Sequence, residues 1–310
     1  MHIVLLDAKT LGDDLDISVF ETFGTFTHYG TTRTNETLSR IENAQIVITN
    51  KVIITKEMMQ SCPHLKLICI AATGMNNVDL EAAKDLNISV KNVAGYSTQS
   101  VVQHTFTMLL HLMGKMRHYA SYATSGAWTN SQLFTDVSQP FHEISGKKWG
   151  IIGLGKIGTE VAKVATAFGA EVSYYSTSQN NLEQDYPHSS LELLLKESDI
   201  ISIHAPLNIQ TQNLINKDNL HLLKDKAILL NLGRGGIVNE KDIASLIDEK
   251  EIYIGLDVIE QEPIPLDNPL LKIHHHERLL ITPHIAWASV EARQKLRDGI
   301  VENITTYLKK

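Results

Sequence analysis

The sequence predicts an α/β protein made of two doubly wound parallel-sheet domains with a cleft between them. Three observations predict this fold class. Short runs of aliphatic and β-branched residues alternate with helical segments along the whole chain. These runs are apolar almost throughout, as in strands buried on both faces of a sheet. The chain has 310 residues, and one long apolar helical segment separates two series of strands, which suits two domains better than one.

The first series has five expected strands with helices between them. Next comes a segment that is apolar, free of proline and begins with Ser and Thr, which favours one long helix over 97–123. Residues 124–148 are polar, contain aromatic residues and show no clear period, which indicates an arm or a partner-binding loop. The expected strands of this first series are 2–7, 26–30, 44–50, 65–72 and 88–93, and its expected helices are 35–43, 55–62 and 77–87.

The second series repeats the same rhythm and ends in a helix at 288–308. We expect residues 1–96 together with 287–310 to form one domain and 97–286 to form the other. The expected strands are 148–154, 170–176, 199–207, 226–233, 252–259 and 279–286, and the helices between them are 156–168, 190–198, 216–223 and 240–250.

Composition excludes several classes of protein. The formal net charge is -7 and the chain has no run of four basic residues, which disfavours nucleic-acid binding. No apolar stretch is long enough to cross a bilayer, and the N-terminus is typical of a first strand rather than a signal peptide. Cys62 and Cys69 match no zinc or thioredoxin spacing. We expect a reduced cytoplasmic protein with Cys62 at the surface and Cys69 in the core.

The segment "GLGKIG", residues 153–158, predicts a dinucleotide site because it follows a strand and opens a helix. Gly153 allows the tight turn, Gly155 lets the backbone approach a pyrophosphate, and Gly158 lets helix and strand pack closely. The alternative is a glycine-rich turn that binds nothing.

The next strand lacks the residue that usually selects the cofactor. Ser176 stands where NAD-binding sites carry an acidic residue. Between Ser176 and Lys196 the sequence has no Arg or Lys that could bind a 2′-phosphate. We therefore expect NAD(H) to be favoured and NADP(H) to be possible.

Three chemically competent residues follow three expected strands of the second series. Arg234 lies among glycines after 226–233, Glu262 follows 252–259, and His284 lies in "TPHIAW". Ligands bind at the carboxyl ends of parallel strands, where a His held by a Glu can exchange a proton and an Arg can hold a carboxylate. An arginine paired with a nearby acid for structural reasons is the alternative.

These motifs resemble those of the D-isomer-specific 2-hydroxyacid dehydrogenases over essentially the whole chain. The similar segments include "HAPL" (204–207), "NLGRGGIVNE" (231–240), "GLDVIEQEP" (255–263) and "TPHIAWAS" (282–289). The segments "AATGMNNVDL" (71–80) and "VVQHTF" (101–106) are closest to the glycerate dehydrogenase, or hydroxypyruvate reductase, branch. The chain ends soon after its last helix, so we expect no regulatory domain of the kind that longer phosphoglycerate dehydrogenases carry.

The resemblance implies a flavodoxin-like substrate domain, a Rossmann dinucleotide-binding domain and reduction of hydroxypyruvate or glyoxylate to D-glycerate or glycolate. It implies that His284 is the general acid/base, that Glu262 orients it, and that Arg234 binds the substrate carboxylate and carbonyl. It further implies a homodimer with an arm near 120–148. Substrate would also contact Thr73, Gly74 and Trp287, and the cofactor would contact Thr105, Gly153, Gly155, Lys156, Ile157, Gly158, Ser176, the stretch from Ala205 and Pro206 to Thr211, Leu232, Gly233, Asp257, His284 and Ala286.

Other interpretations stay open. One is another enzyme on the same scaffold, acting on D-lactate, another 2-oxo acid, formate or phosphite. A second is a dinucleotide-sensing corepressor, against which the net charge of -7 argues. "HHHE", residues 274–277, admits a metal site, but solvated loop histidines fit its polar context better, so we expect no metal.

Overall fold

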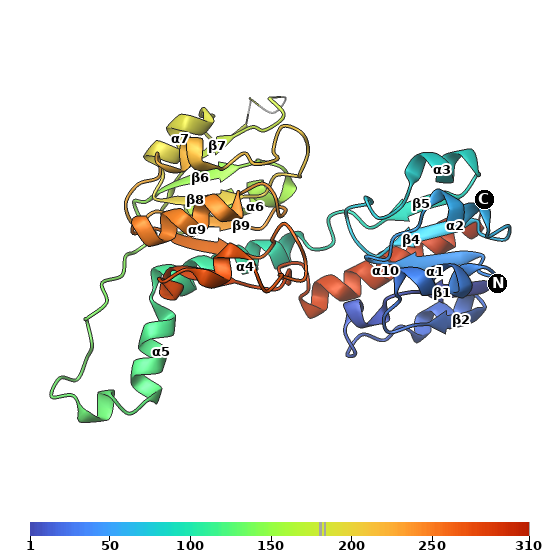
Figure 1. Cartoon of the computed structure of the whole chain (residues 1–310), viewed down its shortest axis with the longest axis horizontal. Helices are drawn as coiled ribbons and strands as arrows, with labels where there is room; N and C mark the ends of the chain where they lie inside the picture. Colours follow the sequence, from blue (N-terminus) through green and yellow to red (C-terminus); the bar gives the residue numbers. More distant parts are fainter. Residues whose placement is uncertain (180–181, 183, 310) are drawn as a thin grey trace. The chain divides into compact units, whose positions relative to one another are not determined.

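A computed structural model describes residues 1–179, 182 and 184–309. The chain divides into two compact units, one of Met1–Ser97 with Trp287–Lys310 and one of Thr98–Ala286. Each unit contains one parallel sheet with helices packed on it (Figure 1). The predicted fold class, two parallel-sheet α/β domains, is confirmed.

The first unit has a five-stranded sheet in the order β2-β1-β3-β4-β5. Strands β3 and β4 are buried along their whole length, which explains why they read as continuous apolar runs. Helix α10, Val290–Leu308, buries Leu296, Ile300 and Ile304 against this sheet. The strands are β1 His2–Leu5, β2 Thr25–His28, β3 Ile46–Thr49, β4 Leu67–Ile70 and β5 Ser89–Asn92, and the other helices are α1 Thr34–Ile41, α2 Lys56–Gln60 and α3 Leu80–Asp85.

Both cysteines are buried, so the expectation of a surface Cys62 is wrong. The turn that follows α2 directs Cys62 into the apolar cluster that holds Met59 and Leu65. Cys69 lies in the middle of β4, where burial raises the pKa of its thiol to about 12. Neither environment favours a reactive thiolate.

The second unit has a six-stranded sheet in the order β11-β10-β9-β8-β6-β7. The strand order reverses at β6, which pairs with both β7 and β8. Ligands of such sheets bind outside the carboxyl ends of the strands at this reversal. The strands are β6 Lys148–Ile152, β7 Glu171–Tyr175, β8 Ile200–Ile203, β9 Ile228–Asn231, β10 Tyr253–Leu256 and β11 Leu279–Ile281, and the helices between them are α6 Lys156–Ala167, α7 Leu191–Glu197, α8 Lys217–Leu220 and α9 Glu240–Glu249.

The single long helix expected over 97–123 is two helices. Helix α4, Thr98–Met113, ends at Gly114, and α5 covers Met116–Thr124. Lys115 between them has a φ of +52°, in the left-handed region. Glycine is a weak helix former, and α5 has no buried residue to continue the apolar face of α4. The chain therefore turns where packing against the sheet ends.

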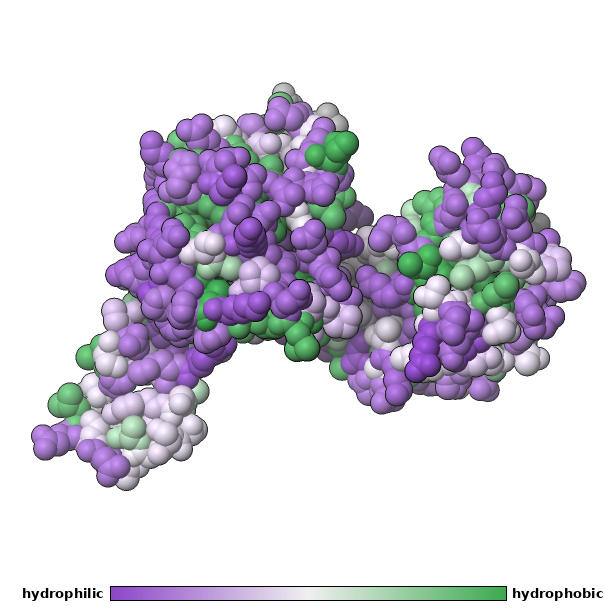
Figure 2. All heavy atoms as spheres, in the orientation of Figure 1, coloured by the Kyte–Doolittle hydropathy of each residue, from purple (hydrophilic) through white to green (hydrophobic). Residues whose placement is uncertain are grey.

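Residues 116–147, called the arm here, leave the sheet of the second unit with α5 and return to β6 (Figure 1). Beyond α5 the arm contains one short 3-10 helix, Trp128–Asn130. Several of its apolar side chains are open to solvent, with Phe134 89% and Val137 77% exposed. Figure 2 shows hydrophobic and neutral surface gathered on this projection. In the described ranges, no helix is both long and apolar enough to cross a membrane.

Candidate functional site

The glycine turn after β6 has the geometry of an anion-binding turn. Gly153 has a φ of +91°, and a Cβ there would lie 2.9 Å from the Ala205 nitrogen. At Gly158 a Cβ would lie 2.3 Å from the Gly153 oxygen, so helix α6 packs directly on the turn. At Gly155, the residue that caps α6, a Cβ would meet no atom within 4 Å. The backbone is thus open beside the first N–H groups of the helix, which fits a pyrophosphate.

The expected cofactor residues Lys156 and Ile157 open α6 at this turn. Ser176 directly follows β7 and is buried. The Gly153 N–H donates to the Tyr175 carbonyl at 3.0 Å, which joins the glycine turn to the end of β7. Ser176 therefore lies at the strand end where a ribose-binding acid would otherwise be expected.

The end of β8 packs against the glycine turn and against the loop after β9. Ala205 is buried between Gly153 and Gly233. The hydroxyl of Thr211 donates to the Pro206 carbonyl at 2.6 Å, which closes the loop from 206 to 211. Both ends of the stretch expected to line the cofactor are therefore held in place.

His204 precedes this loop and is the most unusual polar group of the site. Both ring nitrogens are buried and have no hydrogen-bond partner among the described residues. Desolvation by burial lowers the pKa of His204 to about 3, so the ring is neutral at neutral pH. Buried polar groups normally find a hydrogen-bond partner, so this ring is an exception in the part of the chain that the structure describes.

Arg234 lies on the loop after β9, and the structure explains the glycines around it. A Cβ at Gly233 would lie 2.7 Å from the Ala205 oxygen, and one at Gly235 would lie 1.8 Å from the Ile259 oxygen. The loops after β8 and β10 thus pack directly on the backbone that flanks Arg234. Arg234 as a residue is exposed, and its Nη1 donates to the Gly233 carbonyl at 2.8 Å.

Asn231 shapes the same loop from inside. Its Nδ2 donates to the Arg234 carbonyl at 2.9 Å, and its Oδ1 accepts from the Gly233 N–H at 3.1 Å. The residue is buried at the end of β9 next to Leu232, so these bonds hold the loop to the strand. The backbone that carries Arg234 is therefore fixed on both sides.

His284 and Glu262 are brought together from loops 22 residues apart. The His284 Nδ1 lies 2.7 Å from the Glu262 Oε2. Since a carboxylate accepts, Nδ1 carries the proton and Nε2 is the atom that can gain or lose one. The His284 side chain is 22% exposed, which leaves it accessible to a small ligand.

A residue that sequence reasoning missed, Glu240, holds the loop that carries Glu262. One of its carboxylate oxygens accepts from the Glu260 N–H and the other from the Asn268 Nδ2 at 2.7 Å. Glu240 is buried at the start of α9 although it is charged. Its position in "NLGRGGIVNE" was visible in the sequence, but its partners, 20 and 28 residues away, were not.

Asp257 organises the loop that carries His284. Its Oδ1 accepts from the Thr282 hydroxyl at 2.6 Å and the Ile285 N–H at 2.9 Å, and its Oδ2 accepts from the Ala286 N–H at 2.9 Å. Oδ2 retains capacity for a further donor, which agrees with the cofactor contact that the resemblance implies for Asp257. Thr105 is fully buried, and its hydroxyl donates to the Val101 carbonyl at 2.8 Å.

Thr73, Gly74 and Trp287 belong to the first unit. Thr73 follows β4, and its carbonyl accepts from the Asn92 Nδ2 at 2.6 Å. Trp287 packs edge-on against Tyr96, with ring centroids 6.3 Å apart. The substrate contacts expected of these three residues stay predictions.

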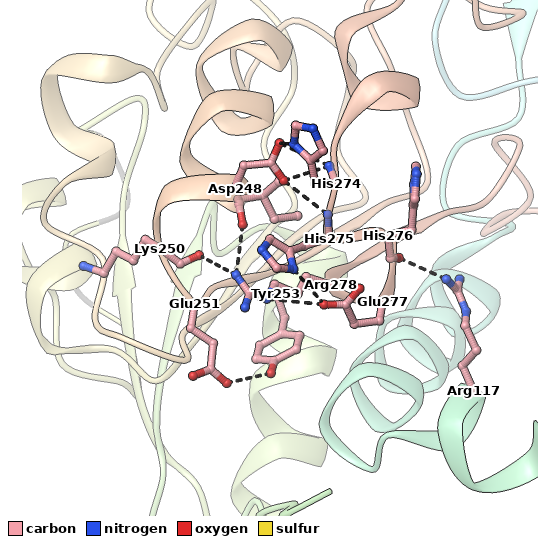
Figure 3. Close-up of polar contacts among 11 residues, drawn as sticks. Arg117, Asp248, Lys250, Glu251, Tyr253, His274, His275, His276, Glu277 and Arg278 are labelled. Carbon is pink, nitrogen blue, oxygen red and sulfur yellow. Dashed lines mark hydrogen bonds and ion pairs between the residues drawn. The ribbon is translucent and has the colours of Figure 1, made fainter. Parts of the chain in front are cut away.

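The histidines of 274–277 bind separate partners rather than converging (Figure 3). The His274 Nδ1 lies 2.9 Å from the Asp248 Oδ2, and the His275 Nδ1 lies 3.1 Å from the Glu277 Oε1. The His276 carbonyl accepts from Arg117 of the arm at 3.0 Å. Across the described residues, no group of three or more His, Cys, Asp and Glu side chains is arranged to hold a metal ion.

Comparison with known proteins agrees with this geometry. The family model described as "D-isomer specific 2-hydroxyacid dehydrogenase, NAD binding domain" matches residues 106–286. A hydroxypyruvate reductase of Blautia hydrogenotrophica is 36% identical over 100% of this chain and 97% of its own length. A glycerate dehydrogenase of Methylorubrum extorquens is 35% identical over 99% and 96%. The solved D-lactate dehydrogenase of Aquifex aeolicus, complexed with NAD and lactic acid, is 26% identical, with a TM-score of 0.82 over 100% of this chain and 96% of that one.

Proposed function

Because the chain belongs to the D-isomer-specific 2-hydroxyacid dehydrogenases, we propose that it reduces hydroxypyruvate to D-glycerate and glyoxylate to glycolate with a nicotinamide dinucleotide. The observation that carries this proposal is the His284–Glu262 pair, held at 2.7 Å at the carboxyl edge of the sheet that also carries the glycine turn. The bound nicotinamide supplies or accepts the hydride.

In this reaction His284 moves the proton. Protonated at both nitrogens, it donates from Nε2 to the substrate carbonyl oxygen while Nδ1 stays bonded to Glu262. The Glu262 carboxylate stabilises the imidazolium before transfer and keeps the ring oriented after it. Its second oxygen accepts from the Ile259 N–H at 3.3 Å, so the carboxylate is itself held in place.

Arg234 binds the substrate carboxylate and polarises its carbonyl. A guanidinium presents a rigid fork of donors, which matches a 2-oxo acid better than the point charge of a lysine does. The packing of Gly233 and Gly235 against neighbouring loops fixes the backbone beneath this fork. Fixed charge at the reacting oxygens lowers the barrier because little reorganisation is needed during the reaction.

The dinucleotide would be held by the residues predicted for it, with the pyrophosphate at Gly155 and Lys156 and the carboxamide at Asp257. Ser176 offers a hydroxyl to the ribose in place of a carboxylate, so no fixed negative charge at this position repels a 2′-phosphate. We expect NADH to be preferred, because the sequence has no Arg or Lys between Ser176 and Lys196 to bind the 2′-phosphate of NADPH. The missing contact between such a cation and the phosphate is worth about 1.5–3 kcal/mol, so the kcat/KM with NADPH should lie within about a hundredfold of that with NADH.

The arm is the surface through which we expect two copies to form a homodimer. Phe134, Val137 and Leu133 are 89%, 77% and 66% exposed, which is unusual for large apolar side chains that stay in water. A second copy would cover them. The small 2-oxo acid and this second copy are the partners that we propose, in a cytoplasmic setting.

A panel of substrates and cofactors tests the function. Purified protein is assayed with hydroxypyruvate, glyoxylate and pyruvate plus NADH or NADPH, and with formate plus NAD⁺. The highest kcat/KM is expected for hydroxypyruvate or glyoxylate with NADH. A protein that binds NADH but turns over none of these acids would be a dinucleotide sensor, and one that prefers pyruvate or formate would be another enzyme on this scaffold.

A further inference from the structure

His104 on α4 contacts the loop that carries His284. Its Nε2 lies 3.0 Å from the Thr282 hydroxyl oxygen and 3.5 Å from the Asp257 Oδ1. The His104 and Asp257 side chains are only 16% and 1% exposed. The sequence alone could not tell whether His104 faces a ligand, a partner or its own fold.

Counting protons gives this network a direction. The Thr282 hydroxyl has one proton, which lies on its 2.6 Å bond to the Asp257 Oδ1. The Thr282 oxygen must then accept from His104, so the Nε2 of His104 carries a proton and donates it. The chain of donors runs from His104 through Thr282 to Asp257, which also accepts from the N–H groups of Ile285 and Ala286.

Helix α4 holds the other end of the same loop as well. The Ser100 hydroxyl donates to the Ala286 carbonyl at 2.6 Å. Ser100 and His104 are four residues apart and so lie on one face of the helix. Between their contacts stands His284, with a φ of +55° and its N–H donating to the Asp257 carbonyl at 2.8 Å. Such backbone persists only where its surroundings determine it.

We infer that His104 is a positioning residue that fixes the 282–286 loop through Thr282 and Asp257 and thereby places His284. The inference rests on the proposed function for the role of His284. The placement of the loop can nevertheless be measured without substrate or cofactor.

Hydrogen exchange of the 284–286 amides in the ligand-free protein tests the placement. His104→Leu removes the donor and should speed exchange of these amides at least about tenfold, because the Asp257 network loosens. His104→Gln keeps an N–H donor and should return most of the protection. Gln103→Ala, an exposed neighbour on α4, is the control and should match the wild type. Unchanged exchange in His104→Leu would overturn the inference.

Kinetics give a second readout. His104→Leu should lower kcat for hydroxypyruvate about 10- to 100-fold, with a smaller change in KM and partial rescue by His104→Gln. Thr282→Val, close in shape to threonine, should cause a similar loss and faster exchange, and it replaces His104→Leu as the test should that variant fail to fold. The double variant should lose little more than either single one, whereas additive losses would contradict action through Thr282.

The two proposals fail in different ways. A wild type that reduces no 2-oxo acid, with exchange responding to His104 as expected, would refute the function and leave the positioning intact. A wild type that reduces hydroxypyruvate, with exchange and kcat indifferent to His104→Leu, would refute the positioning alone.

Discussion

At the scale of single residues, the hydrogen-bond partners of each ionisable side chain in the site determine its proton affinity and orientation. The imidazole of His284 is polarised by a Glu262 carboxylate oxygen at 2.7 Å. The Asp257 carboxylate instead accepts from the backbone N–H groups of Ile285 and Ala286, which follow His284. His204 is the opposite case, a buried ring without a partner among the described residues. Residues of one type thus have different chemistry within one sheet edge.

Replacing His284 should separate chemistry from binding. His284→Ala should lower kcat by about 10²–10⁴-fold because the proton donor is gone. NADH binding, followed by fluorescence titration, should change less than about threefold. A variant that keeps wild-type kcat would show that another group supplies the proton.

Replacing Arg234 should damage both binding and chemistry. Arg234→Ala should raise KM for hydroxypyruvate and lower kcat, and Arg234→Lys should recover little because it cannot form two parallel bonds. Steady-state kinetics measure both effects. Full activity in the lysine variant would mean that only charge is needed at this position.

His204 predicts a pH dependence of stability. Its pKa is depressed in the folded chain to about 3 from 6.5, so below pH 6.5 the unfolded chain binds a proton that the folded chain does not. The free energy of unfolding therefore falls as the pH drops from about 6.5 towards 3. Urea unfolding at pH 7 and 5 should show a fall about 2 kcal/mol larger in the wild type than in His204→Leu. Equal falls would show that the buried ring accepts a proton in the folded state.

At the scale of elements, the site is a set of strand-end loops packed on one another. The loop after β9 meets the loop after β8 at Gly233 and the loop after β10 at Gly235. Helix α4 and α9 add a second layer, since Ser100 and His104 hold the loop of His284 and Glu240 holds that of Glu262. Loops held in this way can keep catalytic groups in position without ligand.

Gly235 should tolerate no side chain. Gly235→Ala would put a Cβ within 1.8 Å of the Ile259 oxygen, so the two loops must separate. We expect a loss of about 1–3 kcal/mol in unfolding free energy and a large loss of kcat. Gly146→Ala is the control, because its Cβ would meet no atom within 4 Å and only its φ of +72° is unfavourable. It should keep its activity; equal kcat in both variants would argue against loop packing as the cause.

At the scale of the whole molecule, the arm differs from the two units because it exposes large apolar side chains instead of burying them in a core. Helix α5 has no buried residue, yet Tyr119 donates to the Gln139 carbonyl at 2.6 Å and His118 lies 3.2 Å from Asp136, so the arm has internal structure. Ordered chain with exposed apolar side chains is typical of a surface that another copy covers.

Charge on the arm should prevent the homodimer that we propose from forming. The double variant Phe134→Asp with Val137→Asp should shift the mass in light scattering from two chains to one. Leu266→Asp, at a side chain 95% exposed outside the arm, should leave the mass unchanged. A wild type that is monomeric at micromolar concentration would remove the basis for a dimer.

The sequence by itself determined the fold class, the strand-and-helix rhythm, the family and the three residues proposed for chemistry. Periodic apolar runs and the Gly, Arg, Glu and His motifs are local patterns, so they can be read without coordinates. The sequence-based prediction was wrong in two places where packing contributes. Helix α4 ends before Gly114, beyond which α5 has no buried residue, and the turn after α2 buries Cys62.

Only the tertiary structure decided what holds the chemistry in place. The bonds from Asp257 to Ile285 and Ala286, from His104 to Thr282 and from Glu240 to Glu260 join residues 20 to 178 positions apart. Residue 235 must be a glycine because the Ile259 carbonyl, 24 residues further along the chain, packs against it, and this contact is equally remote in sequence. Contacts of this kind depend on which strands become neighbours, and no local pattern records that.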